Sequence, residues 1–227
     1  IGWYGDDGRV KLRRGILPAH ADAAFLRAAR AARSQVVVAH VRDASVGPVT
    51  TVNTHPFRCG RWLFAHNGTV ARWRRRRTVR ERIEAGIAPY YRRRIRGATD
   101  SERLFYLFLS RLLAHDALEG ATLEEVRLAL AETTETVAGI ADVADQASSL
   151  NFLVSDGRLL AACRRGRTLH LATGAGPAHS VVVASEPIGT GTWEEIPEGG
   201  FVGTDDGRRV VRAALLAAPA RRRVAGP

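Results

Sequence analysis

The sequence predicts an α+β protein in which β-sheets are faced by helices. Short β-prone runs and one helix open the chain, two long helical segments follow, and a series of antiparallel strand signals closes it. The chain has 227 residues, of which 45% are hydrophobic, and this is enough for one substantial core. We therefore expect one domain.

The first elements are a hairpin, a helix and a strand. Ile1–Tyr4 and Arg9–Leu12 are short β-prone runs, and the Asp-Gly between them is a strong hairpin signal. Ala21–Arg33 is rich in alanine and has a polar start at Asp22, which predicts a helix. Residues 35–41 form a nearly continuous apolar run, which predicts a buried strand that ends at Arg42.

A loop and a second core strand come next. Residues 43–60 have a loop composition with a short extended stretch at Val49–Val52. Arg61–Ala65 is predicted to be a strand that presents His66-Asn67-Gly68 at its end. The basic stretch 71–96 is predicted to be helical in part, with interruptions at Gly86 and Pro89.

Two long helices precede the strands of the second half. Thr99 or Asp100 is a suitable N-cap for a helix through Leu113, and Thr122-Leu123-Glu124-Glu125 predicts a capping box for a helix through Val137. The expected strands after these helices are 151–154, 159–163, 168–172, 181–185 and 201–203. Residues 218–227 are expected to be a disordered basic tail.

Composition limits the classes of function. The formal net charge is +11, but only Lys11 among the 34 basic residues is a lysine, which indicates genomic bias toward arginine. We therefore regard nucleic acid as an unlikely partner. No apolar run is long enough for a membrane span. Cys59 and Cys163 form no CxxC pair, so the sequence suggests neither a disulfide scaffold nor a zinc cluster. This cysteine usage favours a reducing, cytoplasmic setting.

Four residues could together bind an amino acid and stabilise an oxyanion. The planar guanidinium of Arg42 suits a carboxylate, and the carboxylate of Asp100 suits an ammonium group. The Asn67 amide and the Gly68 backbone N–H could donate to an oxygen that becomes negative during amide hydrolysis. Each residue also has an ordinary structural alternative, because Asn-Gly is a common turn, arginine often forms salt bridges and aspartate often caps helices.

His40, His55 and His66 are side chains of a type that binds metal ions. Their spacing matches no helical His-x-x-x-His pair, and no carboxylate in the same motifs completes a ligand set. We therefore predict no metal and no cofactor.

Four ordered motifs resemble the class II glutamine amidotransferases, which belong to the N-terminal nucleophile hydrolases. The motifs are Ala39-His40-Val41-Arg42-Asp43-Ala44-Ser45, Asn53-Thr54-His55-Pro56-Phe57, Phe64-Ala65-His66-Asn67-Gly68 and Gly97-Ala98-Thr99-Asp100-Ser101-Glu102. Later segments are similar to the stand-alone branch that includes the ergothioneine-pathway amidohydrolase. The resemblance implies a four-layer αββα sandwich of two mainly antiparallel sheets, with the domain at residues 1–205 and a strand remnant and basic tail at 206–227.

The resemblance also implies roles for the candidate residues. Arg42 would bind the substrate carboxylate, Asp100 its ammonium group, and Asn67 with Gly68 would form the oxyanion hole. We further place His55 and His66 in the substrate-binding site. The nucleophile of the family is a mature N-terminal cysteine, a place that neither Cys59 nor Cys163 can take, and we expect the chain to be an N-terminally truncated and inactive piece.

The expected function is hydrolysis of the side-chain amide of glutamine or of a γ-glutamyl amide by the full-length protein, through its N-terminal cysteine. The alternative is a degenerate paralogue that binds glutamine or glutamate without catalysis. A small-molecule substrate is the expected partner, and the sequence leaves a homo-oligomer open.

Overall fold

A computed structural model describes residues 1–42, 46–174, 180–205 and 209–216. Its largest element is a six-stranded antiparallel sheet with the strand order β12-β11-β7-β6-β5-β4. The strands are β4 (Phe57–Cys59), β5 (Trp62–Thr69), β6 (Ser149–Ser155), β7 (Leu159–Cys163), β11 (Gly200–Asp205) and β12 (Arg209–Ala214). Hairpins between strands adjacent in sequence form three of the five pairs, and the two long-range pairs are β5 with β6 and β7 with β11.

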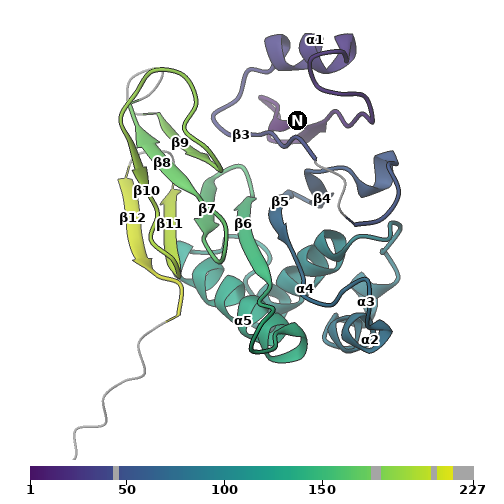
Figure 1. Cartoon of the computed structure of the whole chain (residues 1–227). Helices are drawn as coiled ribbons and strands as arrows, with labels where there is room; N and C mark the ends of the chain where they lie inside the picture. The colour runs from purple at the N-terminus through teal and green to yellow at the C-terminus, as the bar shows by residue number, and fades with distance from the viewer. Residues whose placement is uncertain (43–45, 175–179, 206–208, 217–227) are drawn as a thin grey trace, which may run out of the picture.

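Helices cover one face of this sheet (Figure 1). They are α2 (Arg77–Ala85), α3 (Pro89–Arg92), α4 (Asp100–Ala114) and α5 (Leu123–Ala141). Phe64 of β5 packs against Phe105 and Phe108 of α4 and against Phe152 of β6, and all four side chains are fully buried. This aromatic cluster fixes α4 against the centre of the sheet, and so fixes the position of its N-terminus.

Two three-stranded sheets cover the other face. The first has the order β2-β1-β3, and the second has the order β10-β8-β9. Their strands are β1 (Gly2–Tyr4), β2 (Val10–Leu12), β3 (Val37–Val38), β8 (His170–Thr173), β9 (Val181–Ala184) and β10 (Trp193–Glu195). Leu153 of β6 packs against both apolar clusters that join these sheets to the large one.

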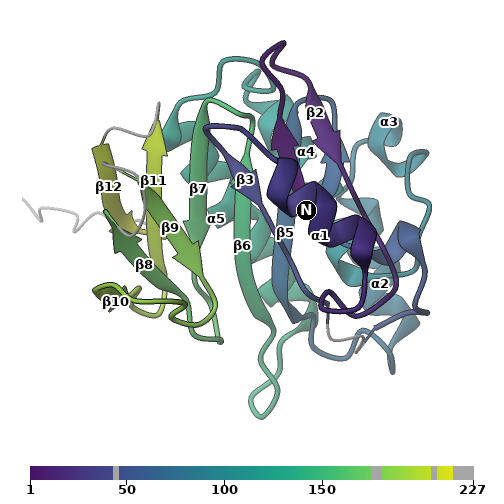
Figure 2. The ribbon, with the colours of Figure 1, turned by 90° about the horizontal axis from the view of Figure 1, so that it is seen from above.

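Helix α1 (Ala23–Ala31) lies outside the first small sheet, so this part of the molecule has four layers (Figure 2). The α+β class with antiparallel sheets, and the layering of helices and sheets, are thus confirmed. The second sheet layer differs from the prediction of one sheet. Among the described residues it consists of two separate three-stranded sheets.

The helix signals of the sequence are confirmed. Asp22 caps α1 by accepting hydrogen bonds from the N–H groups of Ala24 and Phe25. Thr99 is the N-cap of α4, and the Thr122–Glu125 capping box opens α5, which continues to Ala141.

Several strand bounds differ from the prediction. The strand expected at residues 35–41 is limited to Val37–Val38, because only these residues pair with β1. Arg42 therefore lies in a loop and not at the end of a core strand. An extended stretch was expected at Val49–Val52. Its second half belongs instead to a 3₁₀ turn, which spans Thr51–Asn53.

The largest difference concerns β5, which was expected to end at Ala65. It continues to Thr69, because residues 63–69 pair without interruption with residues 149–155 of β6. His66, Asn67 and Gly68 are therefore strand residues, and the Asn-Gly pair is not a turn.

The C-terminal part adds an edge strand. β12 pairs along its whole length with β11, and Leu215 after it is buried in the main core. The predicted tail at 218–227 lies outside the described residues. No helix among the described residues is long and apolar enough to cross a membrane.

Candidate active site

The six predicted site residues line one cavity of about 130 Å³, which we call the inner cavity. It lies where the end of β5, the start of α4 and the segments around residues 40 and 55 meet. The predicted residues in its wall are Arg42, His55, His66, Asn67, Gly68 and Asp100, and the wall also contains His40, Val41, Val46, Thr99, Ser101 and Arg167.

The pairing of β5 with β6 aims the Gly68 N–H away from β6. Gly68 lies opposite Leu150, whose own N–H donates to the Arg165 carbonyl on the β7 side. In an antiparallel ladder the N–H and C=O of one residue point to the same side, so Gly68 and Leu150 form a non-hydrogen-bonded pair. The Gly68 N–H points to the outer side of β5, where β4 reaches only as far as Phe64.

Asp100 lies on this same outer side of β5. Its Oδ2 accepts a hydrogen bond of 2.9 Å from the N–H of Val70, and its Oδ1 accepts one of 2.9 Å from the N–H of Ser101. Val70 is two residues after Gly68, so the N–H groups of both residues face the same way. Asp100 is buried and has its carboxylate at the N-terminus of α4, where the helix dipole favours a negative charge.

His66 links three elements beneath the cavity. Its Nδ1 is 2.9 Å from Ser101 Oγ on α4, and its Nε2 is 3.0 Å from the Ser149 carbonyl on β6. Burial lowers the pKa of His66, so the ring is neutral. Because a carbonyl can only accept, Nε2 carries the proton, and Nδ1 accepts from the Ser101 hydroxyl. Both ring nitrogens of His66 are thus engaged with the protein.

Asn53 holds the two loops beside the cavity together. Its Nδ2 donates to the Pro48 carbonyl at 2.9 Å, and its Oδ1 accepts from the Ala98 N–H at 2.9 Å. The guanidinium of Arg42 donates to the carbonyls of residues 46, 47 and 48 on one of these loops. Arg42 and Asp100 are therefore positioned by loops that one buried amide connects.

Glu102 fixes the loop that precedes α4. Its two carboxylate oxygens accept from the N–H groups of Arg96 and Gly97, at 2.9 and 2.7 Å. A β-carbon at residue 97 would collide with Oδ1 of Asn53. A glycine is therefore required where this loop passes the Asn53 side chain.

His40 and His55 form a stacked pair in the cavity wall. Their ring centroids are 4.1 Å apart, and His55 also packs edge-on against Phe57. Burial lowers the pKa of His40 to about 4 and that of His55 well below its usual value. Among the described residues neither nitrogen of His55 has a hydrogen-bond partner, and Nδ1 of His40 also has none.

These low pKa values predict a loss of stability in acid. Each histidine binds a proton in the unfolded chain below a pH of about 6.5, whereas folded His40 does so only near 4. The unfolded state therefore binds more protons between these values, and the free energy of unfolding falls as the pH drops through this window.

His55→Phe is expected to make this loss of stability smaller, because it keeps the ring stack and removes one titrating group. Thermal unfolding measured between about pH 7 and about pH 4.5 would test this. His20→Gln is the control, since it removes an exposed histidine that lies outside the His40–His55 pair. An unchanged acid sensitivity in His55→Phe would contradict the assignment.

Neither cysteine of the sequence lies in the inner cavity wall. Cys163 on β7 is fully buried, and burial raises the pKa of its thiol to about 12. Cys59 on β4 is half-buried, and burial raises the pKa of its thiol as well. The described residues contain no group of three or more side chains that could hold a metal ion.

Three contributors to the site were not singled out from the sequence. Asn53 and Ser101 lay within the recognised motifs, but their hydrogen bonds depend on segments distant in the sequence. Arg167 brings a cation to the inner cavity from the turn after β7, and no local pattern marks it.

Comparison with known proteins identifies the family. The family of class II glutamine amidotransferases matches residues 1–179. The chain belongs to this family. A similar protein is the gamma-glutamyl-hercynylcysteine sulfoxide hydrolase of Mycolicibacterium smegmatis, with 33% identity over 92% of this chain and 78% of that protein.

Solved structures agree with the fold of this class II glutamine amidotransferase. A glutamine aminotransferase class-II domain protein from Silicibacter pomeroyi superposes with a TM-score of 0.76, at 26% identity over 96% of this chain and 91% of the other. The glutamine phosphoribosylpyrophosphate amidotransferase of B. subtilis, at 18% identity, matches 79% of this chain and 34% of its own with a TM-score of 0.50. The similarity to this second structure supports a shared fold and nothing more.

Proposed function

We propose that the inner cavity binds the γ-glutamyl group of glutamine or of a γ-glutamyl amide, and that the protein hydrolyses the side-chain amide. The observation that carries this proposal is the common orientation of the Gly68 N–H and the Asp100 carboxylate on the outer side of β5. The similarity to a hydrolase named for a γ-glutamyl compound supports it.

The spacing of these groups suits a γ-glutamyl substrate. Asp100 is bonded to the N–H of Val70, two residues from Gly68, and two strand residues span about 6.6 Å. This is the scale of the four bonds that separate the α-nitrogen from the amide carbon in glutamine. Asp100 would bind the ammonium group, while Gly68 would meet the amide oxygen.

Two donors would stabilise the oxyanion. The Asn67 side chain lies on the face of β5 that Leu63 and Ala65 also occupy, while the Gly68 N–H lies at the strand edge. A donor of this kind contributes about 3 kcal/mol to the stability of a transition state. Arg42 would bind the α-carboxylate, since it lines the same cavity. His66, with both nitrogens engaged, would act as a positioning residue for Ser101 and Asp100.

The attacking group would be a cysteine thiolate, as the resemblance to the family implies, with the α-amino group of that cysteine as the base. Attack on the amide carbon would release the amine and leave a thioester, which water would then hydrolyse. Neither Cys59 nor Cys163 lies in the inner cavity wall, so neither would supply this thiolate. We propose that residues 1–227 alone bind the substrate and do not hydrolyse it.

Calorimetry with residues 1–227 tests the binding site. L-Glutamine should bind, while glutaramic acid, which lacks the ammonium group, and 4-aminobutanamide, which lacks the carboxylate, should bind about tenfold more weakly or worse. Arg42→Lys should weaken glutamine binding and leave 4-aminobutanamide unaffected, because a lysine loses the bidentate fork. Equal binding of all three ligands would contradict the site assignment.

A second function is favoured by the absence of a thiol from the inner cavity wall. The protein would then bind glutamine or glutamate without catalysis. Release of ammonia or glutamate by the product of the complete gene separates the two functions, because only the enzyme would show turnover.

A further inference from the structure

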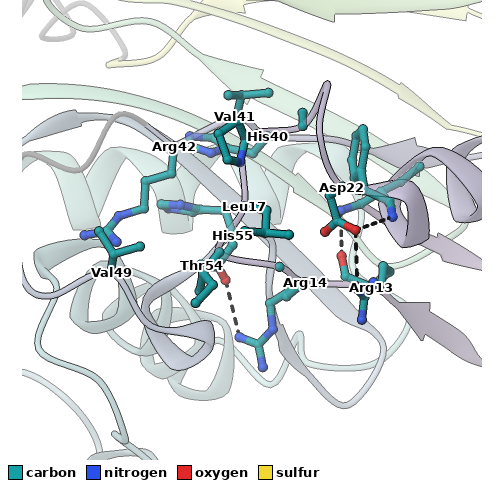
Figure 3. A pocket seen from close by; sticks show the side chains of 16 residues that line it. Arg13, Arg14, Leu17, Asp22, His40, Val41, Arg42, Val49, Thr54 and His55 are labelled. Carbon is teal, nitrogen blue, oxygen red and sulfur yellow. Dashed lines mark hydrogen bonds and ion pairs between the residues drawn. The ribbon is translucent and has the colours of Figure 1, made fainter.

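A second and larger cavity adjoins the inner one. It has a volume of about 340 Å³, and we call it the outer cavity. One wall is the loop 13–19 between β2 and α1, and the others are Val49 and the segments around residues 41 and 54 (Figure 3). The two cavities share His40, Val41, Arg42 and His55.

Exposed apolar side chains line this outer cavity. Leu17 is 61% exposed and Val41 is 74% exposed, and Ile16 and Val49 are also more than half exposed. In Figure 3 the Leu17 side chain lies between His55 and Asp22. Exposed apolar residues gathered around one hollow mark a surface that contacts a ligand with an apolar body.

The charge left over in the outer cavity is positive. Asp22, the acid in its wall, already accepts the two N–H groups at the start of α1 and lies 3.6 Å from the guanidinium of Arg13. Arg14 donates to the Thr54 carbonyl at 3.3 Å, and no carboxylate among the described residues lies within ion-pair distance of it. A half-buried guanidinium without a carboxylate partner is a binding group for an anion.

His55 supplies unpaired polar atoms at the wall that both cavities share. Its side chain is 3% exposed, and among the described residues neither of its ring nitrogens has a partner. A neutral imidazole offers one donor and one acceptor, and leaving both unpaired in a buried place is costly. A ligand that extends from one cavity into the other would satisfy them.

We propose that the outer cavity binds the amine part of the substrate, and that this amine carries an apolar body contacted by Leu17 and a carboxylate bound by Arg14. The substrates would be γ-glutamyl derivatives of apolar amino acids, and glutamine itself would leave the outer cavity unfilled. This inference rests on the proposed γ-glutamyl site in the inner cavity.

Calorimetry with residues 1–227 and a matched ligand series tests this inference. The ligands are glutamine, γ-glutamyl-leucine, and γ-glutamyl-3-methylbutylamide, which has the leucine body without the carboxylate. γ-Glutamyl-leucine should bind about tenfold more tightly than the 3-methylbutylamide, and the 3-methylbutylamide more tightly than glutamine.

Variants separate the two contacts. Arg14→Gln should reduce the affinity for γ-glutamyl-leucine to that of the 3-methylbutylamide and leave glutamine unaffected. Leu17→Ser, on the exposed loop, should weaken both larger ligands and leave glutamine unaffected. Arg9→Gln is the control, because Arg9 is highly exposed and pairs with Asp7 on the hairpin outside the outer cavity.

The outcomes distinguish this inference from the function on which it rests. If glutamine binds and the larger ligands bind no better, the outer cavity is not an amine site and the proposed function stands. If none of the three ligands binds to the folded chain, the proposed function fails. If Arg14→Gln is unfolded, the ligand series with Leu17→Ser still decides.

Discussion

Gly68→Ala is expected to destabilise the protein by about 3 kcal/mol or more, at the upper end of what overpacking costs. A β-carbon at residue 68 would collide with the carbonyl oxygen of Ser149, and it would lie 2.6 Å from the Ser149 carbonyl carbon and 2.8 Å from Nε2 of His66. Because the main obstacle is backbone, β5 and β6 would have to separate. Urea unfolding of the variant and the native chain measures the loss.

Gly139→Ala is the matched control for this substitution. Gly139 lies in α5, and a β-carbon there would meet no heavy atom within 4 Å. The change should raise stability by about 1 kcal/mol through helix propensity. If Gly68→Ala and Gly139→Ala had the same stability, the close approach of β5 and β6 at residue 68 would be wrong.

Asp100→Asn is expected to weaken glutamine binding about a hundredfold, because removal of one partner from a buried charge pair costs about 2–5 kcal/mol. The amide also places an NH₂ group against one of the two backbone N–H donors, Val70 or Ser101. A loss of stability should therefore accompany the loss of affinity. Calorimetry with glutamine and thermal unfolding give the two quantities.

Asp142→Asn controls for the structural part of this effect. Asp142 accepts hydrogen bonds from the N–H and hydroxyl of Ser148 and pairs with Arg165, away from the inner cavity wall. The Asp142→Asn variant should lose stability and keep its affinity for glutamine. Glutaramic acid adds a second test, because its weak binding should not weaken much further in Asp100→Asn. A full further loss would show that Asp100 does not bind the ammonium group.

Local sequence signals predicted the helices well. The bounds of the strands were predicted less accurately, because they depend on pairing with distant segments. The caps at Asp22, Thr99 and Thr122 act within a few residues of their own helices, so the sequence is sufficient to find them. The extent of β5 depends on β6, about eighty residues later in the chain. The polar residues His66 and Asn67 suggested the end of a strand, because nothing in the nearby sequence indicates the pairing of β5 with β6. The short strand β10, which pairs with the earlier strand β8, was missed for the same reason. The short strand β4 was also missed, although its partner β5 directly follows it.

The membership of the candidate site was predictable, but its geometry was not. Ordered motifs placed Arg42, Asn67, Gly68 and Asp100 in one site, and all four line the inner cavity. Their roles stay predictions. The engagement of both His66 nitrogens and the bracing by Asn53 require contacts between segments that are 35 to 83 residues apart. The outer cavity depends on the loop after β2, whose sequence resembles no binding motif.

The phase of the β5–β6 ladder makes loop length a determinant of the site. Leu150 turns its N–H toward β7, and Gly68, its partner in a non-hydrogen-bonded pair, turns its own N–H outward. If the connection between α5 and β6 were changed by a single residue, an accompanying slip of β6 would turn its side chains to the opposite face of the sheet, and Phe152 would leave the main core. Every residue of the inner cavity wall could then be retained while the packing that positions β5 was lost. Insertions and deletions at residues 142–148 should therefore be far less tolerated during evolution than substitutions on the surface of the same connection.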